Sequence, residues 1–502
     1  MTATENVDVV IVGAGISGIG AAYRIHQRNP ALRYVILERR AQIGGTWDLF
    51  RYPGVRSDSS IYSLSFPWEP WTRKEDVADG TDIREYLAET AHKYGIDDHV
   101  RFGSHVQSAD WDGATDTWTV RAIEDGVEQS YRARFVFFGS GYYSYDQGYT
   151  PDFPGLETFA GILVHPQFWP EDLDYAGKRV VVIGSGATAI TLVPALARDA
   201  ARVTMLQRSP TYIIKSGRIS AFTELVRKVL PQRTSHAVAK WSAALLEGML
   251  WLVSRKSPGT MKSLLRRTAV ANLPAGYPVD IHFNPSYDPY DQRLCLDADG
   301  DLFGAISSGR VEVVTDHIER FDATGIALRS GGHIEADIVV TATGLQLQAL
   351  GGVTISLDGT EIKPQDRFIY KAHMLDEVPN LAWCVGYTNA SWTLRADLIN
   401  EYVCRLINYL DMYGLASATP RVDDGPRTDK PFADFSSGYF ARAEHLLPKQ
   451  MTKAPWKQNQ SYMHDMMDLR FGQIEDGVLE MKKKAPAAAA PASAAREAIA
   501  AE

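Results

Sequence analysis

The sequence has little cysteine and no excess of positive charge, and each shortage excludes classes of protein. Its 502 residues include three cysteines, Cys295, Cys384 and Cys404. They are too few and too widely spaced for a disulfide framework or a paired-cysteine zinc or redox site, and no metal site is expected. The formal charge of −9 argues against nucleic acid as the main partner, because phosphate binding needs a basic surface.

Long apolar runs are also missing. The N-terminal segment MTATENVDVVIVGAG lacks the basic start of a signal peptide. No run reaches the roughly 18 apolar residues of a spanning helix, and the nearest, 237–253, is interrupted by Lys240 and Glu247. These features predict a cytoplasmic globular protein. An Ala/Pro-rich stretch, 482–502, is interpreted as a flexible tail.

A short apolar strand, residues 7–12, leads into a glycine turn and then a helical pattern. The turn contains Gly13, Gly15, Ser17 and Gly18. Its glycines suit a tight bend, close approach of a pyrophosphate, and packing of helix on strand. Glu38 follows at the end of the next apolar strand, where an acid binds the ribose hydroxyls of an adenosine and disfavours a 2′-phosphate. The pattern predicts an FAD or NAD site; a turn that only packs a helix is the alternative.

The pattern recurs after a second apolar strand, residues 178–183. The second turn reads Gly184-Ser185-Gly186-Ala187-Thr188-Ala189. Its following strand ends in Gln207-Arg208-Ser209, and arginine there suits a 2′-phosphate through charge-assisted hydrogen bonds. This second site is therefore predicted to bind NADP, unless Arg208 is only a solvated cation at a strand end.

Two further strands, within 133–143 and 336–345, end in small residues and glycine. They suggest that the chain leaves the first domain and later returns to it. The predicted fold is α/β, with two Rossmann-like dinucleotide-binding domains and the NADP domain inserted in the FAD domain. The expected boundaries are 1–145 and 335–481 for the FAD domain, and 146–334 for the NADP domain with a helical insert at about 218–275.

Between the two turns lies a motif built from Phe159, Gly161, His165 and Trp169. It resembles the FxGxxxHxxxW fingerprint of type I Baeyer–Villiger monooxygenases, within the flavin-containing monooxygenases. Segments 44–58, 287–303 and 385–398 extend the resemblance. It is closest to the mycobacterial ethionamide-activating branch and to bacterial relatives that act on aliphatic ketones.

The resemblance implies FAD reduced by NADPH, followed by reaction with O₂ to a C4a-peroxyflavin that converts a ketone, expected to be aliphatic, to an ester. S-oxidation of thioethers or thioamides is expected as a second activity. By resemblance Arg293 is the catalytic cation that stabilises negative charge, and Asp58 is the carboxylate beside the flavin that orients it. The alternatives are a structural salt bridge for Arg293 and a turn-forming residue for Asp58.

The resemblance also assigns cofactor contacts. It places Thr46, Trp47, Asp48 and Leu49 in the loop over the flavin, Val106 beside adenine, and Arg56 and Ser57 near the nicotinamide. The 159–169 motif is expected to couple the linker to domain movement, and His165 is not assigned acid–base chemistry. Residues Asn389 to Thr393 could start a helix that points at the flavin, although Trp392 could equally belong to the core. Many family members have Lys before the catalytic Arg, whereas this chain has Gln292, which leaves Arg208 to carry more of the NADP preference.

The segment 221–271 is basic within an acidic chain. It contains nine Lys or Arg residues against two Glu, and its apolar residues recur at helical spacing. It is interpreted as a helical subdomain beside the substrate tunnel, or as an amphipathic surface that touches anionic lipid.

Three other functions are alternatives to Baeyer–Villiger oxidation of ketones. An ordinary flavin monooxygenase acting on soft S or N centres is the main alternative, which Trp169 and Arg293 disfavour. A pyridine-nucleotide–disulfide reductase would need paired cysteines near the flavin. A nonenzymatic nucleotide-binding module would not consume NADPH and O₂ when given a ketone. The sequence does not indicate the oligomeric state.

Overall fold

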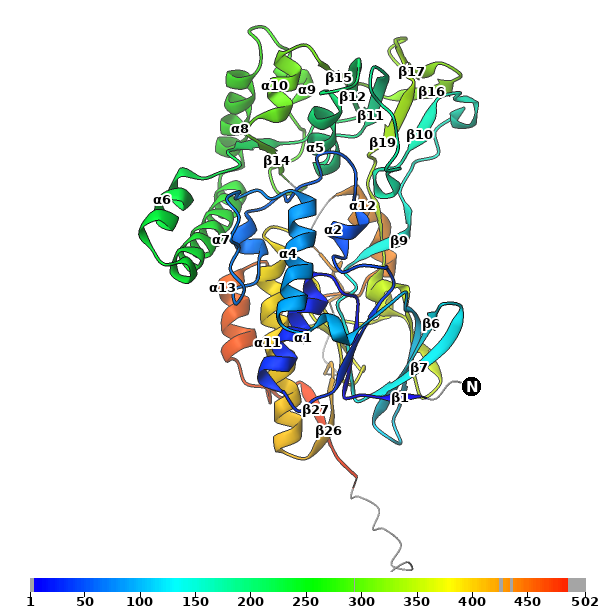
Figure 1. The fold of residues 1–502 in the computed structure, drawn as a ribbon, viewed down its shortest axis with the longest axis vertical. Coiled ribbons are helices and arrows are strands. Elements are labelled where there is room, and N and C mark those ends of the chain that lie inside the picture. Colours follow the sequence, from blue (N-terminus) through cyan, green and yellow to red (C-terminus); the bar gives the residue numbers. More distant parts are fainter. Residues whose placement is uncertain (1–3, 293, 424–427, 434–436, 486–502) are drawn as a thin grey trace, which may run out of the picture.

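The computed structural model describes residues 4–292, 294–423, 428–433 and 437–485. Two five-stranded parallel sheets organise the chain into two lobes, with the first sheet in the lower half of Figure 1 and the second at the top. The predicted α/β fold with two Rossmann-like units is confirmed.

The first parallel sheet has the strand order β25-β8-β2-β3-β4. Its strands are β2 (Val9–Val12), β3 (Tyr34–Glu38), β4 (Val100–Phe102), β8 (Phe135–Phe138) and β25 (Leu381–Trp383). Both faces are buried, which is why these strands read as continuous apolar runs rather than as alternating patterns. The side chains of Val9 and Ile11 join one core cluster, and those of Val10 and Val12 join another.

Helices α1 (Ile16–Arg28), α4 (Gly80–Lys93) and α11 (Trp392–Met412) pack on one face of this sheet. A six-stranded sheet of order β1-β7-β6-β5-β21-β22 covers the other face. Its strands are β1 (Glu5–Asn6), β5 (His105–Asp112), β6 (Thr117–Glu124), β7 (Val127–Ala133), β21 (Thr354–Leu357) and β22 (Thr360–Ile362). The first glycine turn therefore lies at the carboxyl end of a central strand, where parallel sheets bind ligands.

The second parallel sheet has the order β10-β19-β11-β12-β15. Its strands are β10 (Ile162–Val164), β11 (Arg179–Ile183), β12 (Arg202–Gln207), β15 (Val311–Thr315) and β19 (Ile338–Thr341). Helices α5 (Ala187–Leu196) and α10 (Asp301–Ser307) cover one face, and the small antiparallel sheet of β16 (Ile318–Asp322), β17 (Gly325–Leu328) and β18 (His333–Glu335) covers the other.

One predicted boundary is too early. A return to the FAD domain at residue 335 would place β19 in the first unit. In the structure β19 pairs in parallel with both β10 and β11, so it belongs to the second sheet. The chain returns only after Thr341, because the antiparallel pair of β9 (Tyr143–Gly148) and β20 (Leu345–Leu347) carries the two crossings between lobes.

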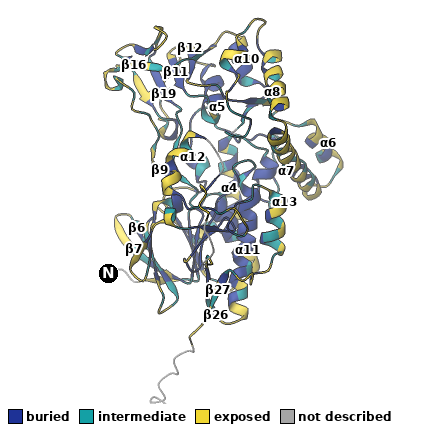
Figure 2. Ribbon diagram, turned by 180° about the vertical axis from the view of Figure 1, so that it is seen from behind, coloured by how far each residue is buried: buried dark blue, intermediate teal, exposed yellow. Residues whose placement is uncertain are grey.

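Helices α6 (Ala221–Val229) and α7 (Gln232–Lys256) project to one side of the lobes in Figure 1, and α8 (Pro258–Asn272) follows them at the edge of the second lobe. Helix α8 packs against β13 (Ile213–Ser216), which pairs with β14 (Cys295–Ala298), whereas α7 packs on the short helix α3 (Ile61–Leu64) of the first lobe. Figure 2 shows exposed positions along α6 and α7. Within the described residues, no helix has the length and apolar character needed to cross a membrane.

Candidate active site

The first glycine turn joins β2 to α1 and is tightly packed. Gly13 has a φ of +98°, a conformation that favours glycine. A Cβ on Gly18 would lie 1.9 Å from the carbonyl oxygen of Gly13, so a larger residue there would separate helix from strand. The N-terminus of α1, with its free N–H groups, therefore faces the cavity beyond β2, where a phosphate would be stabilised.

Glu38 ends β3 beside this turn. Its carboxylate accepts hydrogen bonds from the backbone N–H of Ala14 at 2.6 Å and of Arg40 at 2.8 Å. Burial raises the pKa of Glu38, and these two hydrogen bonds counteract part of that rise. The carboxylate lines the cavity in the position from which it can accept hydrogen bonds from ribose hydroxyls.

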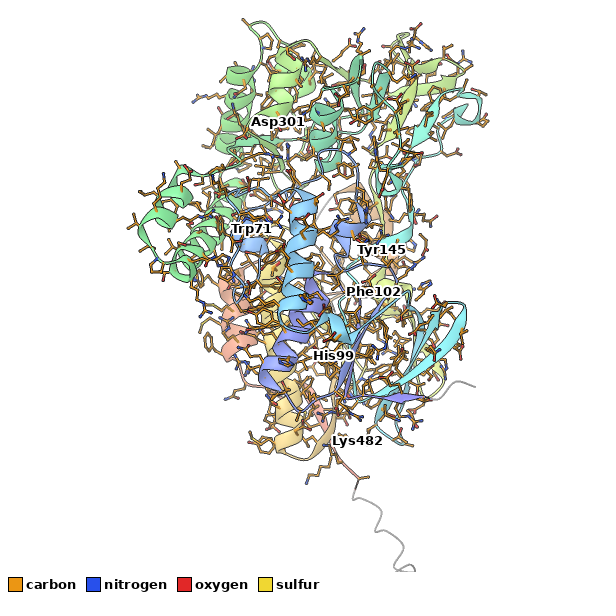
Figure 3. All side chains as sticks on the ribbon, in the orientation of Figure 1. Trp71, His99, Phe102, Tyr145, Asp301 and Lys482 are labelled. Atoms are coloured by element: carbon orange, nitrogen blue, oxygen red, sulfur yellow. The ribbon has the colours of Figure 1, made fainter. Side chains whose placement is uncertain are left out.

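A single cavity runs from Glu38 past the first turn to the junction between the two lobes. Its lining contains many of the predicted site residues: Gly13, Gly15, Ser17, Glu38, Thr46, Trp47, Arg56, Ser57, Asp58, Val106, Ala187 and Thr188. In Figure 3, Tyr145, another lining residue, marks the level of this junction, and Asp301 lies above it in the second lobe. The cavity brings residues of both glycine turns together.

The loop over the cavity, 46–49, divides between two environments. Thr46 and Trp47 line the cavity, whereas Asp48 and Leu49 do not. Asp48 is buried and forms ion pairs with Arg40 and Arg51, and Leu49 belongs to the core of the second lobe. The four residues form the one-turn helix α2 (Thr46–Leu49), whose side chains point in different directions.

The segment 52–58 connects the two lobes. A Cβ on Gly54 would lie 2.5 Å from the carbonyl oxygen of Thr191 in α5, so the two backbones approach closely. The buried Arg56 donates to Asp301 of α10 at 3.0 Å, while its Nε and Nη2 are buried and meet no hydrogen-bond partner within the described chain. Ser57 exchanges hydrogen bonds with the backbone of Ala78.

The second glycine turn is more open than the first. Gly184 has a φ of +137°, and its Cβ would lie 2.3 Å from the carbonyl oxygen of Ala342. A Cβ on Gly186 would meet nothing within 4 Å, which leaves space for a ligand at the start of α5. Ser185 donates to the carbonyl of Ser209 at 3.0 Å. Ala189 is buried, so its small side chain serves packing.

A second arginine accompanies Arg208 at the end of β12. Arg208 is exposed and does not line the main cavity. Arg442, in α12 (Gly438–Ala443), lies with its guanidinium carbon 3.4 Å from the ring centroid of Tyr149. Partial burial lowers the pKa of Arg442, and the nearby charge of Arg208 lowers it further. Two cations thus gather where a 2′-phosphate is expected, and the sequence reasoning missed Arg442.

The fingerprint residues lie outside the main cavity, and His165 among them lies at the crossings between the lobes. His165 Nε2 is 3.1 Å from the carbonyl oxygen of Gly344, and a Cβ on Gly148 would strike its ring. Burial lowers the pKa of His165. Gly161 leaves no room for a side chain between Phe159 and Asp337, and Trp169 lines a separate cleft between the lobes.

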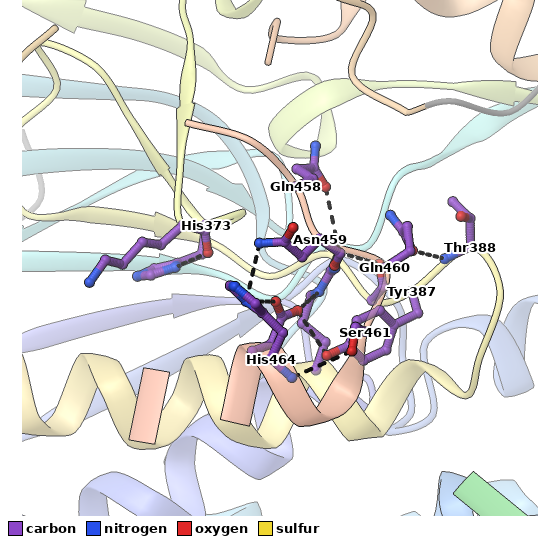
Figure 4. Close-up of polar contacts among 12 residues, drawn as sticks. His373, Tyr387, Thr388, Gln458, Asn459, Gln460, Ser461 and His464 are labelled. Carbon is purple, nitrogen blue, oxygen red and sulfur yellow. Dashed lines mark hydrogen bonds and ion pairs between the residues drawn. The ribbon is translucent and has the colours of Figure 1, made fainter. Parts of the chain in front are cut away.

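The start of α11 forms one wall of the cavity. Trp392 lines it, donates through Nε1 to Ser17 Oγ at 2.8 Å, and stacks on Tyr142. The loop that precedes α11 is hydrogen-bonded to the segment 458–465 (Figure 4). The side-chain oxygen of Gln460 accepts from the backbone N–H of Thr388, and its backbone carbonyl accepts from the side-chain amide of Asn389. Trp392 is thus a cavity wall as well as a packed residue.

Arg293, the predicted catalytic residue, lies outside the described residues. Its predicted partner Asp58 lines the cavity. Several lining residues were not among the predicted site residues: Tyr142, Tyr143, Gln348 and Tyr387. The small residues and glycines at 139–141, which end the apolar strand within 133–143, line the cavity.

The cavity suits a flavin dinucleotide. Ser140 lines it, and the Ser140 hydroxyl is buried and without a hydrogen-bond partner among the described residues. Together with the Glu38 carboxylate and the N–H groups of the first turn, this hydroxyl offers donors and acceptors along the length expected of FAD. At the junction, the unpaired Arg56 nitrogens offer donors to a second nucleotide.

Comparisons with other proteins identify the family of the chain. A family model described as flavin-binding monooxygenase-like matches residues 6–256. The FAD-containing monooxygenase EthA of Mycobacterium tuberculosis is 49% identical over 482 residues, covering 96% of this chain and 99% of that protein. The predicted family resemblance is confirmed.

Solved structures share the fold. A steroid monooxygenase bound to NADP matches with a TM-score of 0.75 at 24% identity, covering 95% of this chain and all of that one. Cyclohexanone monooxygenase from Rhodococcus sp. Phi1 bound to NADP⁺ matches with a TM-score of 0.75 at 21% identity, covering 96% of this chain and all of that one.

Proposed function

The chain belongs to the flavin-binding monooxygenase-like family of FAD- and NADPH-dependent monooxygenases, and we propose that it is a Baeyer–Villiger monooxygenase. Its proposed reaction converts ketones, aliphatic ones in particular, to esters with one atom of O₂. S-oxidation of thioethers or thioamides is the proposed second activity, in keeping with the similarity to EthA. The observation that carries the proposal is the single cavity into which residues of both glycine turns open.

The two glycine turns have separate proposed roles. The first turn with Glu38 and Val106 would hold FAD, and the second turn with Arg208 would hold NADPH. This assigns the first sheet to an FAD domain in two pieces and the second sheet to an inserted NADP domain. When bound, FAD would supply electron transfer from NADPH and activation of O₂.

The residues at the lobe junction would prepare the reacting region. Trp47 and Trp392 line the cavity with aromatic surface that would exclude water. The unpaired nitrogens of Arg56 would donate to oxygens of the nicotinamide half of NADPH. Asp58 would orient the guanidinium of Arg293, which would stay positively charged and stabilise negative charge as the ketone reacts. His165 would couple the lobes, because it contacts both crossings.

Product analysis tests this function. Purified FAD-loaded protein is given NADPH, O₂ and a panel of linear, cyclic and aryl ketones and a thioether. Ester formation supports the proposal, whereas sulfoxide without any ester would favour an ordinary S/N-monooxygenase. NADPH and O₂ consumption that no substrate stimulates would contradict both.

The Arg293→Ala variant tests the proposed catalytic cation. We expect it to oxidise NADPH but to form no ester from a ketone. Arg310→Ala, which removes an exposed arginine beyond α10, is the control and should retain activity. Ester formation at the unsubstituted rate by Arg293→Ala would refute the assignment.

A further inference from the structure

The helices α6 and α7 present large apolar side chains to solvent. We define their apolar face as nine residues whose exposed fractions run from 38% to 69%: Phe222, Leu225, Val229, Trp241, Leu245, Leu246, Met249, Leu252 and Val253. Monomeric soluble proteins rarely expose so many large apolar residues on two adjoining helices, and such patches mark interaction sites. Figure 2 shows these helices projecting from the rest of the molecule.

The opposite side of α7 is anchored to the first lobe. His236 and Lys240 are buried, and His236 Nε2 is 2.9 Å from Ser65 Oγ. Glu247 accepts from Ser63 Oγ at 3.2 Å and from the backbone of Ser391 at 3.3 Å. At about 100° per residue, these positions share one side of the helix, while Leu245, Met249 and Leu252 lie on the other. Contacts with the first lobe on its opposite side therefore fix the orientation of α7, so that its apolar face points to solvent.

Fewer basic side chains are available around this face than the count of nine in the sequence suggests. Of the nine basic residues in 221–271, Lys240 is buried, Arg227 donates to backbone carbonyls, and Arg255, Lys262 and Arg266 form ion pairs. Four exposed cations have no ion pair within the described residues: Lys228, Arg233, Lys256 and Arg267. Lys228 lies near the end of α6, Arg233 and Lys256 lie at the two ends of α7, and Arg267 lies within α8, so exposed cations stand at both ends of the apolar strip on α7.

We propose that the α6–α7 face docks on the surface of an anionic lipid bilayer. An amphipathic surface with an apolar side and a cationic rim fits the headgroup boundary, where its apolar side chains enter the acyl region and its cations meet anionic headgroups. An anionic bilayer fits this face better than a second copy of the chain does. A symmetric contact between two copies would bring the same four cations of each copy close together, and they would repel one another. The rest of an acidic chain would be repelled by the lipid, which orients the molecule.

Flotation with vesicles tests the proposal on the FAD-loaded full chain. Vesicles of phosphatidylcholine alone are compared with vesicles that also contain phosphatidylglycerol. We expect flotation with the anionic vesicles, weakened by salt. Replacing the four exposed cations with Gln should lower the partition coefficient about tenfold or more, and Leu245→Asp with Met249→Asp should abolish flotation.

The control is Met412→Asp, which places a charge on an even more exposed apolar residue at the end of α11. It should float like the unsubstituted protein. Equal flotation by every variant, or no flotation with anionic vesicles, would overturn the proposal, as would a dimer that the Leu245 and Met249 substitutions dissociate without any lipid binding. Because binding is measured without turnover, failure here leaves the proposed monooxygenase reaction untouched.

Discussion

Replacing Arg208 or Arg442 with Gln should reduce the preference for NADPH over NADH. Both side chains are exposed: Arg208 follows the carboxyl end of β12, and Arg442 lies in α12 with its guanidinium against the Tyr149 ring and within reach of the charge of Arg208. The two cations raise each other's electrostatic energy, and a bound 2′-phosphate would relieve that repulsion while accepting hydrogen bonds from both. Arg442 would thereby take the part of the lysine that Gln292 replaces.

The size of the effect follows from the type of interaction. A hydrogen bond between charged groups contributes about 1.5–3 kcal/mol. Solvent screening at these exposed positions favours the lower end, which corresponds to about tenfold per arginine. The double variant should lose more than either single one, because both cations would contact the same phosphate.

The assay is the steady-state kcat/KM for NADPH and for NADH in each variant. NADH lacks the 2′-phosphate, so its kcat/KM should stay unchanged while that for NADPH falls. Arg202→Gln, at the other end of β12 and paired with Glu312, is the matched control. An unchanged cofactor preference, or an equal fall for both cofactors, would refute the reasoning.

Two further predictions concern packing and pH. Gly18→Ala should yield protein without flavin absorbance, because the new Cβ would collide with the Gly13 carbonyl oxygen. Gly186→Ala should retain FAD but bind NADPH more weakly, because its Cβ would enter the open space at the start of α5. Flavin absorbance in purified Gly18→Ala protein would contradict this reasoning. Burial lowers the pKa of His236 from 6.5 to about 4, so the unfolded chain binds more protons below pH 6.5 and stability should fall as pH drops from there toward 4. The loss at pH 5 is about 2 kcal/mol, and the unfolding midpoint should depend less on pH in His236→Asn than in the unsubstituted protein; identical profiles would exclude His236 as the cause.

Local patterns were the part of the structure that could be predicted. The glycine turns, the distal Glu38 and the apolar strands depend on residues close together in the chain, and the structure has strands and helices where these patterns indicate them. The membership of β19 in the second sheet was missed, because the pairing of parallel strands is decided by contacts distant in sequence. Arg442 was missed for the same reason.

The loop 46–49 illustrates a finer limit. A family motif marks four consecutive residues as a unit, but the structure winds them into one helical turn, which separates Trp47 in the cavity from Asp48 among the arginines. The motif therefore indicates a loop that lies at the cavity, without indicating which of its side chains face the cavity. Only the backbone conformation makes that distinction.

The burial of all three cysteines has a consequence for an enzyme that handles O₂. Cys295, Cys384 and Cys404 are buried in the core and form no disulfide, and burial raises the pKa of Cys384 and of Cys404 to about 12. Thiolates, rather than thiols, react with hydrogen peroxide, and access of the oxidant is required as well. Any hydrogen peroxide released when reduced flavin reacts with O₂ without a substrate would therefore meet no exposed thiol on the enzyme. Oxidation of the enzyme should then appear on exposed methionines such as Met412 before it appears on a cysteine.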